Sequence, residues 1–194
     1  MAKIIVFDGI PGAGVSALKD CLLGLFKKAK LKCYFYSIEK KFPELITEAM
    51  KESQSTSSRN QIIMLARAHL DTLILDSLPD RKDDDYIFID RWWGNTIAHL
   101  PYLHIGIKPD NELWKTYPLN FKTKILHTFF VNTPVKTAMN RLGYMSRYEE
   151  NVLRNIRKEY LKLAEQYNWI KLSGTLPVEK LAKKSAHIIA PHKL

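Results

Sequence analysis

The sequence predicts an α/β protein in which helices cover both faces of a parallel β-sheet. Short apolar, β-branched segments alternate with longer segments of helical periodicity, and no internal repeat or low-complexity tract interrupts them. With 194 residues, 46% of them apolar, the chain can bury a sizeable core and suits a single domain over residues 1–194. We therefore expect three layers around a central sheet of about five strands.

Each expected element has its own local pattern. Residues 4–7 are all apolar and precede a Gly-rich loop, which is typical of a buried central strand. In the next segment Leu18, Leu22 and Leu25 share one helix face while lysines occupy the other. The further expected strands are 33–38, 86–89, 125–131 and 169–172, and the further helices are 60–78, 148–167 and the segments opened by Pro134 and by Pro177. The Pro- and Trp-bearing stretch after Asp90 is expected to be irregular.

The charge balance points to anionic partners. Thirty Lys and Arg residues against twenty Asp and Glu give a net charge of +10. No segment reaches the ~20 apolar residues of a membrane-spanning helix, and no signal peptide is recognisable, so we expect a cytoplasmic protein without a membrane partner. The two cysteines, Cys21 and Cys33, have neither metal-ligand nor disulfide-framework spacing.

The loop after the first strand has the frame of a phosphate-binding loop. A Gly-rich turn that leads from a strand into a helix directs backbone N–H groups at one point, where they bind phosphate. The full pattern is G-x-x-x-x-G-K-[ST], and here Val15 stands in place of the lysine. A tight turn without a ligand is the alternative interpretation. The candidate phosphate ligands are Gly9, Gly12, Ala13, Gly14, Val15 and Ser16.

Basic residues at strand ends and in one later segment are further candidates. Asp90 and Arg91 end an apolar strand at the expected carboxyl edge of the sheet, where α/β folds bind ligands, although an internal Asp–Arg pair is the alternative. Arg67 lies in an apolar helical stretch and needs a ligand or a salt bridge. Arg141 and Arg147 flank Gly143, which is consistent with a mobile lid that closes over phosphates, or with solvated helix charges.

Several short motifs together resemble those of the thymidylate kinases, a family of P-loop nucleoside monophosphate kinases, over nearly the whole chain. They are Phe7-Asp8-Gly9 with Gly12-Ala13-Gly14, Leu65-Ala66-Arg67, Asp90-Arg91-Trp92, Asn132-Thr133-Pro134 and Arg147-Tyr148-Glu149. The resemblance implies the three-layer P-loop NTPase fold with a short lid near residues 141–150. It also implies phosphoryl transfer from ATP to a nucleoside monophosphate, with dTMP as the expected acceptor, and a homodimer.

The resemblance further implies a role for each matching residue. Arg91 would hold the acceptor phosphate beside Asp90, and Ser16 and Asp90 would hold Mg²⁺. Arg147 would reach the transferring phosphoryl group, with Arg91, Asp90 and Arg147 as the catalytic residues, and Arg141 would reach the donor ATP. Acceptor contacts would come from Arg67, Asn95 and one of Lys40 and Lys41.

Three departures from the family pattern leave other functions open. The loop has Val15 in place of lysine and Pro11 in place of an acidic residue, and Ile63 stands where an aromatic residue would stack on the acceptor base. Either a lid arginine or Lys19 could supply the missing charge. A second hypothesis is therefore a kinase-derived nucleotide-binding protein with little or no turnover, which acts as a regulator or partner subunit. A third, nucleic-acid binding through the lysines at positions 27, 28, 30 and 32, is less favoured than a solvated surface.

Overall fold

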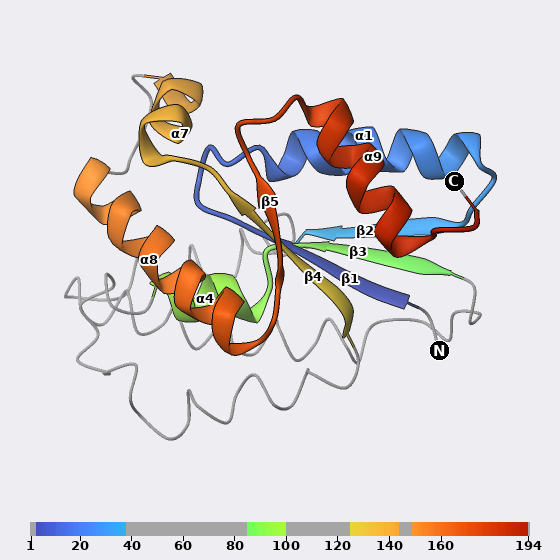
Figure 1. Cartoon of the computed structure of the whole chain (residues 1–194), viewed down its shortest axis with the longest axis horizontal. Helices are drawn as coiled ribbons and strands as arrows, with labels where there is room; N and C mark the ends of the chain where they lie inside the picture. Colours follow the sequence, from blue (N-terminus) through green and yellow to red (C-terminus); the bar gives the residue numbers. More distant parts are fainter. Residues whose placement is uncertain (1–2, 38–84, 100–124, 144–148, 194) are drawn as a thin grey trace, which may run out of the picture.

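The computed structural model describes residues 3–37, 85–99, 125–143 and 149–193. Five parallel strands form one sheet in the order β2-β3-β1-β4-β5 (Figure 1). The strands are β1 (Lys3–Asp8), β2 (Cys33–Ser37), β3 (Tyr86–Asp90), β4 (Ile125–Asn132) and β5 (Ile170–Ser173). This arrangement confirms the predicted α/β fold with a parallel sheet of five strands.

The strand order places β1 at the centre of the sheet. After β1 the chain runs to the edge at β2, returns to β3 beside β1, and then crosses to β4 on the other side of β1. In parallel sheets, ligands bind outside the carboxyl ends of the strands at the point where the strand order reverses. That point lies at the end of β1, which is where the Gly-rich loop begins.

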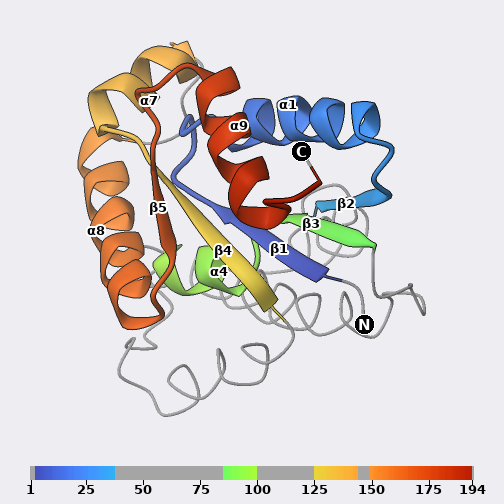
Figure 2. The ribbon, with the colours of Figure 1, turned by 45° about the vertical axis from the view of Figure 1, so that its right-hand side comes forward.

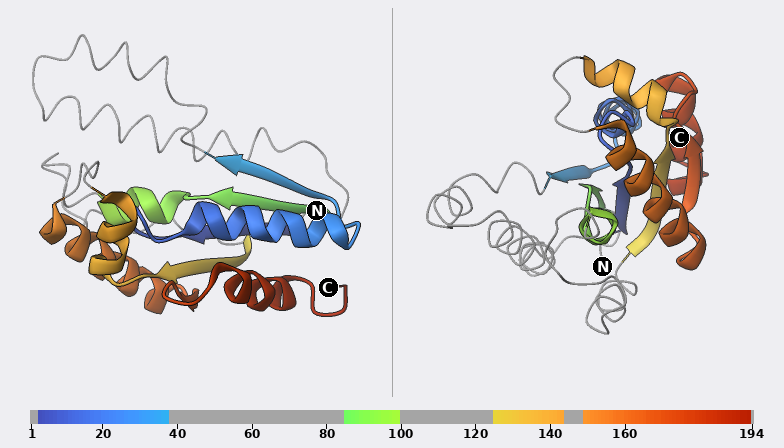
Figure 3. Two further views of the ribbon diagram at one scale, coloured as in Figure 1. Left: turned by 90° about the horizontal axis from the view of Figure 1, so that it is seen from above. Right: turned by 90° about the vertical axis from the view of Figure 1, so that its left-hand side faces the viewer.

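Helices cover both faces of the sheet, which makes three layers (Figures 2 and 3). The helices α1 (Val15–Lys28) and α9 (Val178–Ile189) lie side by side on one face. On the other face α4 (Trp93–His99) packs against α8 (Glu150–Gln166). The short helix α7 (Val135–Leu142) follows β4 and lies near its carboxyl end. The loop at the end of β1 therefore lies close to α7 as well as to α1.

The core is built around the aromatic side chains of the central strands. Phe7 of β1 is fully buried, stacks on Phe129 of β4 with ring centroids 5.2 Å apart, and meets Phe88 of β3 edge-on at 5.7 Å. Burying one such side chain stabilises the fold by about 1.5–3 kcal/mol. Phe26 of α1 also packs edge-on against Phe88, at 5.1 Å, and thereby fixes α1 above the same strands.

The local patterns predicted most elements correctly, and one expectation was wrong. The stretch after Asp90 is not wholly irregular, because residues 93–99 form the helix α4. All of its residues except Ile97 are buried, so the helix has no alternating polar face for periodicity to reveal. The predicted helix over 60–78 lies outside the described residues. The helix expected over 148–167 runs from Glu150 to Gln166.

Two glycine substitutions should separate packing from helix propensity. A Cβ on Gly94 would lie 2.4 Å from Cη2 of Trp169 and 2.7 Å from Oδ2 of Asp8, whereas a Cβ on Gly24 would meet nothing within 4 Å. We expect Gly94→Ala to lower the free energy of unfolding by about 1–3 kcal/mol through overpacking. Gly24→Ala, the matched control within α1, should raise it by about 0.5–1 kcal/mol. Urea denaturation measures both, and a stabilised Gly94→Ala variant would contradict the close packing of α4.

Candidate functional site

Two carboxylates lie at neighbouring strand ends on the carboxyl edge of the sheet. Asp8 ends β1 and Asp90 ends β3, and the register pairs Phe7 with Asp90. On the far side of β3, Asp90 is also level with Ser37, the last residue of β2. Residues that lie far apart in the sequence therefore meet at one edge, as the strand pattern predicted.

The Gly-rich loop turns sharply from β1 into α1. Gly12 and Gly14 have positive φ angles of 77° and 97°, a region that glycine occupies without strain. The N–H of Ala13 donates to the carbonyl of Ile10 at 2.9 Å, which closes the turn. The first intrahelical hydrogen bond of α1 runs from the N–H of Leu18 to the carbonyl of Gly14 at 3.0 Å. The N–H groups of residues 15–17 therefore have no acceptor within the helix.

The start of α1 is well suited to an anion. In the described part of the chain no side chain caps this helix, and its first turn contains no acidic residue. The helix dipole adds positive potential at the same place. Ser16 is exposed there, so its hydroxyl is accessible to a ligand. These features are the physical requirements of a phosphate site at a helix N-terminus.

The loop packs directly on the backbone of β4 and α7. A Cβ on Gly12 would lie 2.4 Å from the carbonyl oxygen of Ala138 in α7. A Cβ on Gly9 would lie 3.1 Å from the carbonyl oxygen of Val131 in β4. Both glycines are therefore required by close approach, in addition to the turn geometry at Gly12. The loop is fixed between α1, β4 and α7.

Val15 occupies the position of the missing lysine and contributes no charge. Its side chain is only 4% exposed, and its Cγ2 lies 3.3 Å from the place where a Cβ on Gly9 would stand. The valine thus packs into the base of the loop as a core residue. An anion at this loop would meet backbone N–H groups rather than a lysine side chain at position 15.

Lys19 does not replace the missing lysine in this structure. Its Nζ lies 4.3 Å from the ring centroid of Phe35 and 2.9 Å from Oδ1 of Asp20. Phe35 is level with Phe88, two residues before the end of β3. The cation–π contact holds Lys19 over β2.

Arg141, in contrast, contacts the loop. Its Nη1 donates to the carbonyl of Ala13 at 3.0 Å, and its Nη2 donates to the carbonyl of Gly174 at 2.8 Å. Nη1 also lies 3.3 Å from where a Cβ on Gly14 would stand. The sequence predicted that Arg141 would serve the donor site, and the structure places its positive charge against the outer wall of the loop. Both terminal nitrogens are bound to backbone carbonyls.

Thr133 also binds the loop, which sequence reasoning did not predict. Its hydroxyl donates to the same carbonyl of Ala13 at 2.9 Å, and the residue is fully buried. The sequence offers one signal, because Thr133 lies between Asn132 and Pro134 at a strand end. Nothing in the sequence shows that its partner is a loop 120 residues earlier.

A buried polar group connects the end of β1 with α4 and α8. The hydroxyl of Tyr160 donates to Oδ1 of Asn95 at 3.1 Å and lies 3.5 Å from Oδ1 of Asp8. All three residues are at most 8% exposed, and Tyr160 also stacks on Phe130. The side-chain oxygen of Asn95, a predicted acceptor ligand, therefore faces the core. Nothing in the sequence marks Tyr160 as a member of this group, because it lies among the buried apolar residues of α8.

Arg91 follows β3 in a left-handed backbone conformation with φ of 59°. Its N–H donates to the carbonyl of Phe7 at 2.9 Å, so the bend is held by the central strand. Left-handed geometry at a residue other than glycine costs about 1–3 kcal/mol and is concentrated at functional sites. Arg91 is half-buried and follows Asp90 at the carboxyl edge of the sheet, the edge at which the sequence predicted this pair.

Other predicted site residues lie outside the described residues: Lys40, Lys41, Arg67 and Arg147. Of the expected lid over 141–150, the first two residues belong to the last turn of α7 and Glu150 begins α8. Farther along α8, Arg157 donates from Nε to Oδ1 of Asn132 at 2.8 Å. This arginine thereby reaches the carboxyl end of β4.

The oxygen-bearing side chains fit a magnesium ion bound mainly by phosphates. Among the described residues, no three His, Cys, Asp or Glu side chains form a group that could hold a metal ion by themselves. The exposed hydroxyl of Ser16 and the carboxylate of Asp90 are hard oxygen donors at the same edge of the sheet. Mg²⁺ takes few protein ligands and completes its shell with water and phosphate oxygens.

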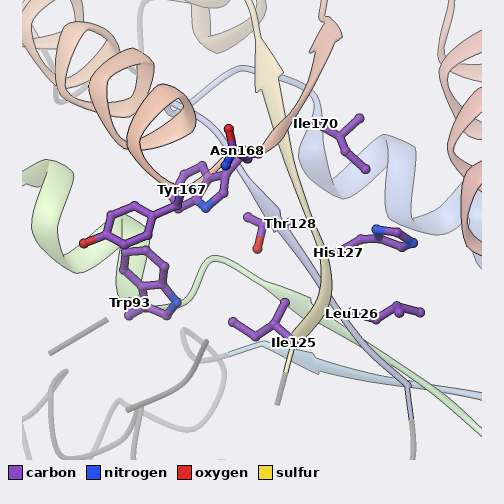
Figure 4. A pocket seen from close by; sticks show the side chains of 9 residues that line it. Trp93, Ile125, Leu126, His127, Thr128, Tyr167, Asn168 and Ile170 are labelled. Atoms are coloured by element: carbon purple, nitrogen blue, oxygen red, sulfur yellow. The ribbon is translucent and has the colours of Figure 1, made fainter. Parts of the chain in front are cut away.

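A pocket of about 200 Å³ lies at the opposite, amino end of β4 (Figure 4). Trp93 and Tyr167 line one side of it, and the side chains of the first residues of β4 line the other. Burial lowers the pKa of His127 and raises the pKa of Tyr167, so both rings are neutral at pH 7. The Trp93 ring packs edge-on against Tyr167 at 5.1 Å and Trp169 at 5.3 Å, so it is a core residue.

A second, basic pocket of about 530 Å³ also lies away from the loop, at the end of α1 and the start of β2. It contains Lys27, Lys30 and Lys32, three of the lysines considered above for nucleic-acid binding.

Cys21 and Cys33 are both free thiols. No helix in the described ranges is long and apolar enough to cross a membrane.

The sequence was compared with known protein families, and the match includes the Gly-rich loop. A sequence model of the family described as thymidylate kinase matches residues 7–185. The chain belongs to the thymidylate kinase family. It is therefore a kinase by family, as its short motifs predicted, and the match extends from β1 into α9.

Three curated relatives resemble this family member over nearly their full length. A probable thymidylate kinase of Sulfurisphaera tokodaii is 27% identical over 97% of this chain and 96% of its own length. Probable thymidylate kinase 1 of Saccharolobus solfataricus is 24% identical over 97% of both chains. A probable thymidylate kinase of Metallosphaera sedula is 26% identical over 96% of this chain and 92% of its own.

Removing the Tyr160 hydroxyl should test the buried polar group. Tyr160→Phe keeps the ring but leaves the buried oxygen of Asn95 without its donor, so we expect a loss of about 1–3 kcal/mol in the free energy of unfolding. Tyr167→Phe is the matched control, because the described partner of its hydroxyl is the exposed amide of Gln166. The control should change stability by less than about 0.5 kcal/mol. Thermal and urea unfolding measure both variants. If Tyr160→Phe and Tyr167→Phe lower the free energy of unfolding by the same amount, a structural role for the Tyr160 hydroxyl is contradicted.

Proposed function

We propose that this protein transfers the γ-phosphoryl group of ATP to a nucleoside monophosphate, and that dTMP is the preferred acceptor. The observation that carries the proposal is the uncapped start of α1 behind a loop of two left-handed glycines, next to Asp90 and Arg91. The thymidylate kinase match over residues 7–185 and the three relatives named as probable thymidylate kinases support the substrate class.

The donor phosphates bind in the loop formed by Gly9, Gly12, Ala13, Gly14, Val15 and Ser16. Backbone N–H groups of the loop and of the first turn of α1 donate to the phosphate oxygens. The guanidinium of Arg141 lies against Gly14 and contributes positive potential at short range. This charge partly compensates for Val15, although it acts from outside the loop.

The acceptor nucleotide binds beside Asp90, on the side away from the loop that holds the donor phosphates. Arg91 holds the acceptor phosphate through charge-assisted hydrogen bonds, which are stronger than neutral ones. The left-handed backbone of Arg91, held by the carbonyl of Phe7, sets the direction in which its side chain leaves β3. Arg67 and one of Lys40 and Lys41 contact the acceptor nucleotide, and Arg147 reaches the transferring group, as the family resemblance implies.

Ser16 and Asp90 are the residues that would hold Mg²⁺, which when bound neutralises charge on the donor phosphates. An oxygen of the acceptor phosphate attacks the γ-phosphorus while the bond from that phosphorus to the β,γ-bridging oxygen breaks. ADP leaves with the electron pair of the broken bond. Positioning and charge stabilisation carry this reaction without a covalent enzyme intermediate.

A nucleotide-binding protein with little or no turnover is the second candidate. The buried, uncharged Val15 favours it, because a lysine at this position acts on the β- and γ-phosphates. Loss of one charge-stabilising donor in a transition state costs about 2.7–4 kcal/mol, or about 10²–10³ in rate. Such a protein would retain ATP binding through the backbone of the loop.

An assay of ADP release with a panel of nucleoside monophosphates distinguishes the two candidates. We expect ATP-dependent turnover with dTMP as the fastest acceptor, because the family and the relatives point to that substrate. The background is ADP release without any acceptor. If the protein binds ATP but no nucleoside monophosphate raises the rate of ADP release above this background, the kinase proposal is overturned in favour of the second candidate.

Restoring the lysine should raise the rate. We expect Val15→Lys to increase kcat by roughly tenfold or more, since the ammonium adds a charge on the transferring phosphates. Val15→Met is the matched control, because it adds a similar unbranched chain without a charge. Its rate should stay at or below that of the unchanged protein. A rate increase shared by both variants, or absent from Val15→Lys, would contradict the assigned donor pose.

A further inference from the structure

Two side chains from later segments of the chain bind one backbone oxygen of the phosphate loop. The carbonyl of Ala13 accepts hydrogen bonds from the hydroxyl of Thr133 at 2.9 Å and from Nη1 of Arg141 at 3.0 Å. The other terminal nitrogen of Arg141 donates to the carbonyl of Gly174 at 2.8 Å. The loop, the link between β4 and α7, the last turn of α7 and the turn between β5 and α9 are thereby joined.

The junction is closely packed. A Cβ on Gly174 would lie 1.7 Å from the hydroxyl oxygen of Thr133, so only glycine fits there. The N–H of Gly174 donates to the carbonyl of Asn132 at 3.0 Å, which holds the turn against β4. Thr133 is fully buried and Gly174 is buried. Arg141 therefore spans two backbone segments whose separation is already fixed.

We propose that Thr133 and Arg141 are positioning residues that hold the phosphate loop in its anion-binding conformation before the nucleotide binds. The two side chains are called the Ala13 clamp below. Arg141 uses both terminal nitrogens on carbonyls, and Thr133 is fully buried, so each acts on the nucleotide through the position of Ala13. The expected effect of the clamp on ATP binding rests on the function proposed above. The expected effect of the clamp on the order of the loop does not.

The clamp matters more because the loop has no lysine. Fixing the backbone of a free residue costs about 1–2 kcal/mol, and a loop that is ordered in advance avoids this cost when its ligand binds. Val15 carries no charge, so it adds no electrostatic attraction that would offset the free-energy cost of ordering the loop. A preordered set of N–H groups is then the main source of donor affinity, and Arg141 adds its charge at the same point.

Hydrogen exchange of the full-length protein without nucleotide tests the clamp directly. We expect Thr133→Val and Arg141→Lys to speed exchange of the hydrogen-bonded loop amides of Ala13 and Leu18 by about tenfold or more, since local opening becomes easier. Arg141→Lys keeps the charge but cannot bridge the two carbonyls as the planar guanidinium does. Arg154→Lys is the matched control, because Arg154 is exposed and pairs with Glu150. It should leave loop exchange unchanged.

Nucleotide binding and kinetics give the second measurement. Thr133→Val and Arg141→Lys should weaken ATP binding and raise the KM for ATP by about five- to tenfold, with the KM for the acceptor unchanged. Thr133→Ser keeps the donor hydroxyl and should restore both loop exchange and ATP binding. This rescue separates the clamp from general damage to the core by valine.

The possible results are distinguishable. Wild-type exchange of the loop in both clamp variants, or faster exchange with unchanged ATP affinity, would overturn the proposal. Equal increases in KM for ATP and acceptor would also overturn it, because they indicate general destabilisation. If the unchanged protein binds no ATP, the proposed function fails, and the exchange measurement still decides whether Thr133 and Arg141 hold the loop.

Discussion

The burial of β1 from Ile4 to Asp8, between β3 and β4, is the constraint on which the rest of the structure depends. Because β1 is central, its aromatic and β-branched side chains form the core that both helix layers cover. The same position requires the chain to leave β1 at the carboxyl edge, where the strand order reverses. Asp8, the Gly-rich loop and the start of α1 follow from that exit, and the pairing of Phe7 with Asp90 brings the end of β3 beside them.

The phosphate loop combines a backbone suited to anions with an unusual distribution of charge. Its lysine position holds Val15, which packs into the base of the loop, and Lys19 is held over Phe35 by a cation–π contact. The positive charge that touches the loop comes instead from Arg141 on α7. The charge of Arg141 therefore lies at the outer wall of the loop, whereas the N–H groups of the first turn of α1 have no acceptor within the helix. The net charge of +10 does not show which of the basic side chains contacts the loop.

Much of the fold and part of the site could be predicted from local sequence patterns. All five strands were predicted from short apolar runs, and the loop from its two glycines, because these signals depend on neighbouring residues alone. The pair Asp90 and Arg91 was placed at the carboxyl edge because parallel strands end together. The helix α4 was missed because nearly all of it is buried, so no polar face marks its period. The role of Asn95 as a core hydrogen-bond acceptor was equally hidden.

The sequence by itself determined the parallel sheet, the family and the absence of the loop lysine, since each depends on residue type and spacing. Only the tertiary structure decided which side chains contact the loop. Thr133 and Arg141 are 120 and 128 residues away from Ala13, and they reach its carbonyl because β4 lies next to β1. Tyr160 joins Asp8 and Asn95 for the same reason, because α8 packs against α4 below the central strand. Contacts of this range follow from strand order and helix packing, which no local pattern encodes.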